Sequence, residues 1–106
     1  MGSKGSIKVG GNVNQVATQR WTLQETENND RRQDHEFGSV FNANDTMVMR
    51  FEGDKGSVGV TNDALQVEGG TFTHNHPDKY FGGTFSDADL RIFAKSKWKE
   101  LRASTG

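Results

Sequence analysis

The clearest pattern along the chain is a series of short apolar runs separated by turn residues, beginning at residue 36. The runs "EFGSVF" (36–41) and "TMVMRFEG" (46–53) predict two strands, and the second has apolar side chains at every other position. The "NAND" between them predicts the turn of an antiparallel hairpin, because Asn and Asp tolerate turn conformations. Three more runs predict further strands: "SVGV" (57–60), "GTFTHNH" (70–76) and "LRAST" (101–105). We therefore expect a sheet of about five strands, mainly antiparallel.

Two segments of this region have helical patterns instead. "TNDALQVEGG" (61–70) predicts one or two helical turns, with Thr61 or Asn62 as the N-cap and Gly69 as the stop. "DADLRIFAKSKWKE" (87–100) predicts an amphipathic helix that begins after a Ser86 cap, with carboxylates in its first turn and lysines toward its end. Its predicted apolar stripe consists of Leu90, Phe93, Ala94 and Trp98.

The N-terminal third has few apolar positions. Residues 1–12 are rich in Gly, Ser and Lys, so we expect them to be disordered. Residues 13–33 contain Val13, Val16 and Ala17 at helical spacing, which predicts a weak helix that frays into a polar run. The pattern as a whole predicts one domain of the α/β class, α+β type, over residues 13–106, with helices flanking the sheet.

The composition argues against several classes of function. The net charge of −1 and a pI of about 6.3 argue against binding to nucleic acid or to an acidic membrane surface. The absence of cysteine leaves only His, Asp and Glu as metal ligands. No apolar run is long enough to span a membrane, and the N-terminus lacks the apolar region of a signal peptide. We expect an intracellular, cytoplasmic protein.

The segment "HNHP" carries the most specific chemistry. His74 and His76 would project from the same face of a strand, about 6–7 Å apart at the backbone, so their rings could converge on one ion. Asn75 would point the other way. Asp89, one turn into the following helix, could supply a third ligand, and a fourth position open to water is typical of catalytic zinc.

Each of these residues also has a simpler interpretation. A His-x-His pair on a strand can be a solvated face, Asp89 can merely complement the helix dipole, and Ser86 can merely cap the helix. Glu36 can be a surface charge. The contiguous string "HNH" does not indicate an HNH nuclease, because that motif uses widely separated residues.

With these residues in view, "HNHP" followed by "FSDAD" resembles the H-x-H-P…S-x-x-D signature of the JAMM (JAB/MPN) metalloproteases. The resemblance is nearest to the short RadC-like and phage head-morphogenesis branches of that family, and it is specific only over residues 73–89. It implies a curved sheet between helices and a Zn²⁺ ion held by His74, His76 and Asp89.

The same resemblance assigns further roles. Ser86 matches the family's serine and would donate a hydrogen bond to the developing oxyanion. The family also requires a glutamate on an early strand, for which Glu36 is our candidate as the catalytic base. Glu25 and Glu27 lie in a polar stretch, and Glu52 ends a strand at a turn, so we favour these three less.

The chain departs from the family pattern in the loop between His76 and Ser86. Nine residues, 77–85, stand where the family usually has seven. Tyr80 and Phe81 lie in this glycine-flanked loop and would either bind substrate, by lining a channel for an extended peptide, or fold back on the core.

The resemblance implies a zinc-dependent hydrolase that cleaves peptide or isopeptide bonds, with a protein or peptide as substrate. The alternative is a non-catalytic JAMM-like domain that binds protein or assembles into a phage or mobile-element particle. The short C-terminus makes this copy either a minimal domain or a piece of a longer protein.

Overall fold

The structure is a computed structural model that describes residues 6–77 and 85–105. Its elements, in chain order, are β1 (Ser6–Val9), β2 (Gln15–Val16), α1 (Leu23–Asp30), β3 (Phe37–Phe41), β4 (Met47–Glu52), β5 (Ser57–Val60), α2 (Asn62–Leu65), β6 (Thr71–His76), α3 (Asp87–Lys95) and β7 (Glu100–Thr105). Among these residues, no helix has the length and apolar character that crossing a membrane requires.

The strands form two sheets. The larger has five strands in the order β2-β4-β3-β6-β7, antiparallel throughout except for the parallel pair β6–β7. The smaller is the parallel pair β1–β5. The α+β class and the mainly antiparallel five-stranded sheet predicted from the sequence are therefore confirmed. One strand differs, because β5 was expected in this sheet but pairs with β1, and β2 takes the fifth place.

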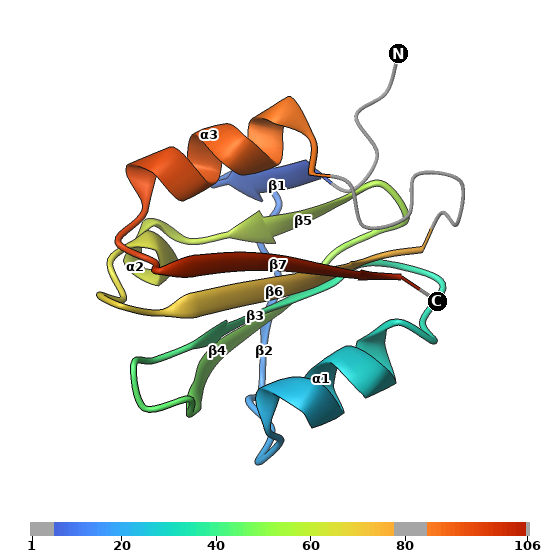
Figure 1. Ribbon diagram of the computed structural model, residues 1–106. Helices are drawn as coiled ribbons and strands as arrows, with labels where there is room; N and C mark the ends of the chain where they lie inside the picture. The colour runs from blue at the N-terminus through green and yellow to red at the C-terminus, as the bar shows by residue number, and fades with distance from the viewer. Residues whose placement is uncertain (1–5, 78–84, 106) are drawn as a thin grey trace.

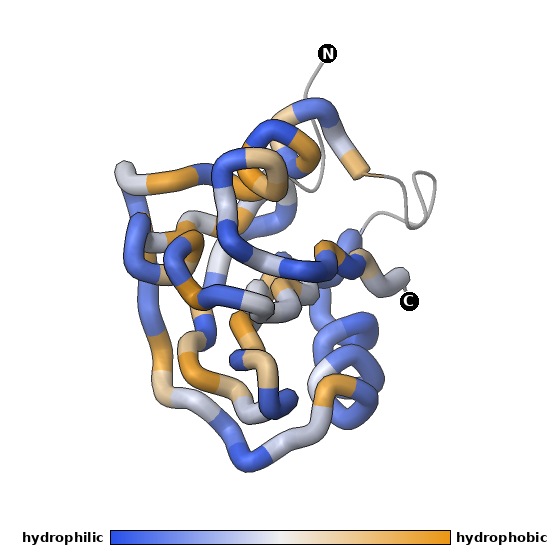
Figure 2. The backbone as a smooth tube through the Cα atoms, turned by 60° about the vertical axis from the view of Figure 1, so that its left-hand side comes forward, coloured by the Kyte–Doolittle hydropathy of each residue, from blue (hydrophilic) through white to orange (hydrophobic). Residues whose placement is uncertain are grey.

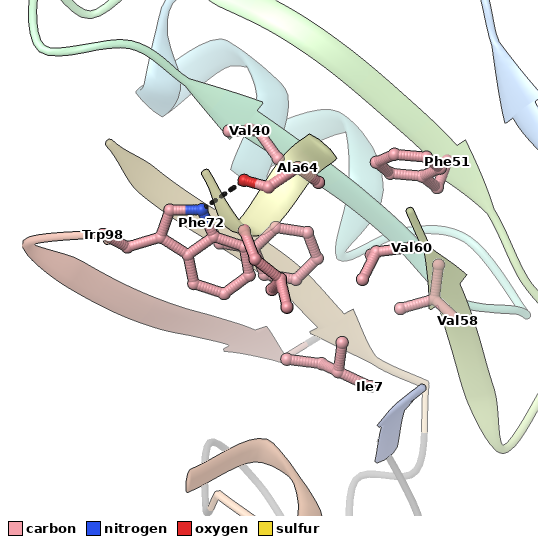
Figure 3. Packing of buried hydrophobic residues seen from close by; sticks show 9 residues of the cluster. Ile7, Val40, Phe51, Val58, Val60, Ala64, Phe72 and Trp98 are labelled. Atoms are coloured by element: carbon pink, nitrogen blue, oxygen red, sulfur yellow. Dashed lines mark hydrogen bonds between the residues drawn. The ribbon is translucent and has the colours of Figure 1, made fainter. Parts of the chain in front are cut away.

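The elements are arranged in layers around the five-stranded sheet. Helix α1 lies on one side of it, and α3 lies on the other side together with β1 and β5 (Figure 1). The hydrophobic core fills the space on the α3 side, where Phe72 and Trp98 stack with ring centroids 4.7 Å apart. The Trp98 indole donates to the Ala64 carbonyl at 2.8 Å, so its polar atom is satisfied inside the core (Figure 3).

The α1 side of the sheet is held by polar contacts instead. Helix α1 is mostly hydrophilic along its length (Figure 2). Arg50 of β4 forms two hydrogen bonds to the Asp30 carboxylate, at 2.8 and 3.0 Å, and a third to Ser39 at 2.9 Å. All three residues are buried, so this contact is a satisfied interior ion pair.

The predicted hairpin is confirmed, because β3 and β4 pair antiparallel across residues 42–46. A register shift between Val40 and Phe41 places Met47 opposite Phe41 and leaves Val48 as the extra residue of a bulge. Thr61 caps α2 through its hydroxyl, as one of the two predicted caps. The helix ends at Leu65, well before Gly69, which instead has a left-handed φ of 66°.

The N-terminal prediction was wrong where the structure describes it. Within the segment expected to be disordered, residues 6–9 form strand β1, and Ile7 is buried in the core. The predicted helix over residues 13–33 is also wrong in its position, because Gln15 and Val16 pair with β4 and the helix begins only at Leu23. Thr22 and Glu25 form a capping box that fixes this start.

The predicted stripe on the last helix was right for Phe93 and Trp98, which pack in the core, and wrong for Leu90 and Ala94. Helix α3 ends at Lys95, so Trp98 enters the core from the connection to β7. Leu90 is 48% exposed and Ala94 is exposed, whereas Ile92 and Phe93 pack against the core. The helix is rotated so that Asp89, which is fully buried, faces inward.

Candidate metal centre

The centre lies where β6 ends and α3 begins. Strand β6, helix α3 and strand β7 form a parallel βαβ unit, in which the helix starts near the carboxyl end of the first strand. This topology explains why residues 74 and 76, at the end of β6, meet residue 89, in the first turn of α3. All three side chains are buried.

The three side chains converge with the spacing of metal ligands. His74 Nε2 lies 3.0 Å from His76 Nε2 and 3.1 Å from Asp89 Oδ2, and His76 Nε2 lies 3.9 Å from the same oxygen. Three ligand atoms in a tetrahedral set, each about 2.0–2.1 Å from one Zn²⁺, are about 3.3–3.4 Å from one another. The arrangement could therefore hold a metal ion.

The tautomer of His74 strengthens this interpretation. Its Nδ1 lies 2.8 Å from the carbonyl oxygen of Arg102, which can only accept, so Nδ1 carries the proton. A neutral His74 then presents a bare Nε2 lone pair to the Asp89 oxygen and to His76. An additional proton or a metal cation must lie among these atoms to make their contacts favourable. A backbone carbonyl that fixes the far nitrogen is the usual support of a metal-binding histidine.

Asp89 is anchored from two directions. Its Oδ1 accepts from the backbone N–H of Ile7 at 2.8 Å, and its Oδ2 accepts from the N–H of Ser86 at 3.3 Å. Burial opposes ionisation of this carboxyl. The additional proton, when it lies on His74 Nε2, hydrogen-bonds to the carboxylate and attracts it, and together with the N–H groups of Ile7 and Ser86 it outweighs burial and lowers the pKa of Asp89. The carboxylate is therefore charged and oriented before any ligand arrives.

His76 is kept neutral, whereas Asp89 is kept charged. Burial and the neighbouring His74 lower the pKa of His76, and the attraction of Asp89 only partly opposes them. A lowered pKa keeps the imidazole neutral at pH 7, which is the form that binds a metal.

Glu36 is the unusual residue of this region. It immediately precedes β3 and is fully buried, and neither carboxylate oxygen has a hydrogen-bond partner among the residues that the structure describes. Burial, followed by the charges of Asp89 and Asp54, raises its pKa to about 9. An orphaned buried carboxyl group is costly unless something else in the site interacts with it. A divalent cation at the three ligands would meet that need, so the residues present fit such an ion.

The other glutamates considered from the sequence are engaged elsewhere. Glu25 caps α1, Glu27 binds Arg102 and Thr73 on the α1 side of the sheet, and Glu52 binds His35. Glu36 is the one that shares an electrostatic environment with Asp89. It therefore stays our candidate for the base.

Ser86 caps α3, as expected. Its hydroxyl oxygen accepts from the N–H of Asp89 at 3.1 Å, and the two residues form a capping box. The capping interpretation and a role at the centre are compatible, because the cap holds the helix start beside β6. Tyr80 and Phe81 lie outside the described residues.

Sequence reasoning missed three supports of the centre. They are the N–H of Ile7, the carbonyl of Arg102 and the side chain of Asn75, which reaches β3. The first two are backbone groups from distant segments, and no side-chain pattern marks them. Asparagine is depleted in strands, so Asn75 in the middle of a predicted strand was a signal that could have been used.

Comparisons of the chain with family models, with curated proteins and with solved structures find no match. The buried His74, His76 and Asp89 are compatible with the JAMM pattern, and the resemblance is limited to that motif.

Proposed function

We propose that this protein is a zinc-dependent hydrolase of the JAMM type that cleaves peptide or isopeptide bonds. The observation that carries the proposal is a buried His-His-Asp cluster beside Glu36. The Glu36 carboxyl group shares the electrostatic environment of Asp89 and has no hydrogen-bond partner within residues 6–77 and 85–105. A merely structural metal site would need no such carboxyl group, whereas a hydrolase needs a base beside its ion.

His74, His76 and Asp89 would hold the Zn²⁺. When bound, zinc lowers the pKa of water to about 7 and polarises a carbonyl group. A cation beside Glu36 also lowers the pKa of that carboxyl, which makes it available as an ionised base.

The chain's own residues then divide the remaining work. Glu36 accepts a proton from the attacking water, the water oxygen bonds to the carbonyl carbon, and the carbon–nitrogen bond breaks. Glu36 returns the proton to the leaving amine, so that it ends in its starting form. Ser86 donates a hydrogen bond to the carbonyl oxygen as negative charge develops there.

The test uses the full chain loaded with one equivalent of Zn²⁺. Two probes are presented: a library of internally quenched peptides, and a library in which the scissile bond joins a carboxyl group to a lysine ε-amine. We expect cleavage in at least one library, its loss with chelator, and its loss in Glu36→Gln with zinc retained.

Glu52→Gln is the matched control, because Glu52 is a glutamate on the neighbouring strand that pairs with His35. It should leave cleavage unchanged. Zinc uptake without any cleavage, or full activity of Glu36→Gln, contradicts the proposal. The first outcome favours the non-catalytic protein-binding alternative.

A further inference from the structure

Strands β3 and β6 part at the metal centre, after His74. Their paired register ends at Gly38 and His74, although β6 continues alongside β7 as far as His76. Glu36 lies beyond this last pair. Its position relative to the two histidines therefore depends on whatever connects the strands after they separate.

That connection is the side chain of Asn75. Its Oδ1 accepts from the N–H of Phe37 at 2.6 Å, and its Nδ2 donates to the carbonyl of His35 at 2.9 Å. These are the backbone groups on either side of Glu36. A carboxamide supplies a donor and an acceptor on one short planar group, so it can take the place of the missing ladder bonds.

The backbone of Glu36 is fixed on its other edge too. Its N–H donates to the Asp54 carbonyl at 2.8 Å, and its carbonyl accepts from the N–H of Gly53 at 2.7 Å. Among the described residues, no hydrogen bond holds the Glu36 carboxylate itself. The backbone frame therefore sets where the carboxylate lies, and Asn75 closes that frame on the β6 side.

We propose that Asn75 is a positioning residue that fixes Glu36 relative to the His74–His76 pair. Asn75 stands between the two histidines in β6. One face of this strand therefore carries the ligands His74 and His76, and the other carries Asn75, which holds the backbone on both sides of Glu36. This inference rests on the proposed function for the role of Glu36, but its structural part can be measured without a substrate.

The experiment compares four variants of the full chain: Asn75→Ala, Asn75→Asp, Glu36→Gln and the double variant Asn75→Ala/Glu36→Gln. Asn75→Asp keeps the shape and the acceptor for Phe37, and it replaces the amide donor to His35 with an oxygen that donates only while its carboxyl is protonated, the form that burial favours. It therefore provides a milder change if Asn75→Ala folds poorly. Asn42→Ala is the matched control, because the Asn42 side chain also forms two hydrogen bonds to the backbone, accepting from the N–H groups of Asn44 and Thr46 at the other end of β3.

The first readout is the visible spectrum of the Co²⁺-loaded protein as a function of pH. We expect Asn75→Ala to shift its pH midpoint in the same direction as Glu36→Gln, Asn75→Asp to shift it less, and Asn42→Ala to leave it unchanged. In the Glu36→Gln background, Asn75→Ala should add no further shift. A purely structural role predicts a further, additive change instead.

The second readout is cleavage of whichever library probe the zinc-loaded wild type accepts. We expect Asn75→Ala to lower kcat about 10- to 100-fold, the usual effect of a supporting residue at a metal site, with KM little changed. Equal behaviour of Asn75→Ala and Asn42→Ala in both readouts, or an undiminished effect of Asn75→Ala beside Glu36→Gln, overturns the inference.

The two proposals can fail separately. Spectral shifts in a protein that cleaves neither library overturn the proposed function and leave Asn75 as the positioning residue of Glu36. Cleavage that depends on Glu36 but not on Asn75 supports the proposed function and overturns the positioning role of Asn75. A protein that takes up neither Co²⁺ nor Zn²⁺ overturns both.

Discussion

Strand β6 separates two kinds of buried polar chemistry. On the face toward α3, His74 and His76 meet Asp89 with too few protons for every contact, and the Glu36 carboxylate has no hydrogen-bond partner among the residues that the structure describes. On the face toward α1, Thr73 donates to Glu27, which also binds Arg102, and nearby Arg50 satisfies Asp30 twice. Groups that are satisfied stabilise a fold, whereas groups left unsatisfied indicate a place where a ligand completes the interactions.

The largest effect on stability should come from removing the buried ion pair on the face of the sheet toward α1. Asp30→Ala leaves the buried Arg50 guanidinium without its charge partner, which costs about 3–5 kcal/mol of unfolding free energy. Urea denaturation checks this value. Metal stoichiometry, measured in the folded protein, should stay at the wild-type value, and a loss of metal would show that the two faces are not independent.

The next largest effect is the stabilisation that a metal ion provides at His74, His76 and Asp89, on the face toward α3. At a free Zn²⁺ concentration of 100 times Kd, binding stabilises the native state by about 2.7 kcal/mol. His74→Ala removes a ligand and should abolish this stabilisation. Unfolding midpoints with and without Zn²⁺ provide the measurement. His35→Ala is the control, because this partly buried histidine contacts Asp34 and Glu52 instead of the centre, and it should keep the full zinc-dependent shift.

The third effect is a dependence of the stability of the metal-free protein on pH. Because the pKa of Glu36 is about 9 in the folded state and near 4.5 otherwise, the folded protein retains a proton that the unfolded chain loses. Stability should therefore fall as pH rises within this window, by up to about 1.4 kcal/mol between pH 7 and pH 8.

Glu36→Gln should remove that slope and stabilise the metal-free protein at pH 8. Chemical denaturation at pH 7 and 8 tests the prediction. Below pH 6.5 the lowered pKa of His76 acts in the opposite direction, because the unfolded chain then binds the additional proton, so the comparison is made above that range. A slope that persists in Glu36→Gln assigns it to another group.

The smallest effect on stability should come from the partly exposed ion pair between Arg102 and Glu27, on the face of the sheet toward α1. Arg102 contacts Glu27 at 2.6 Å, but the arginine side chain is 39% exposed. Arg102→Met should therefore cost about 1 kcal/mol or less. The Arg102 carbonyl that accepts from His74 is unaffected by this substitution, so metal affinity should not change. Isothermal titration with Zn²⁺ checks that expectation.

The sequence predicted best those elements whose signal is local. The β3–β4 hairpin, β5, β6 and β7 follow from alternating residues and turn chemistry, and the Ser86 cap from its position before the helix. The same patterns missed β1, because "SIKV" is short and its partner β5 lies about 50 positions away. Local periodicity contains no information about such a pairing.

The centre was predicted in a similarly uneven way. The residues expected to meet, His74, His76 and Asp89, were found by their motif, and the structure brings them together. The inward rotation of α3 was not predicted, because a buried Asp89 contradicts the rule that the apolar stripe faces the core. The burial of Glu36 was also not visible in its neighbours, since a charged residue next to Asp34 and His35 has the local appearance of a surface.

The hydrogen bond from Ile7 to Asp89 joins positions 82 residues apart. Closing so long a loop is entropically unfavourable early in folding, so we expect this contact to form only when the rest of the chain is already in place. A chain that lacks β1 would therefore present an incompletely held carboxylate. The orientation of this candidate ligand would then depend on the docking of β1, the first strand of the chain and the one farthest from it in sequence.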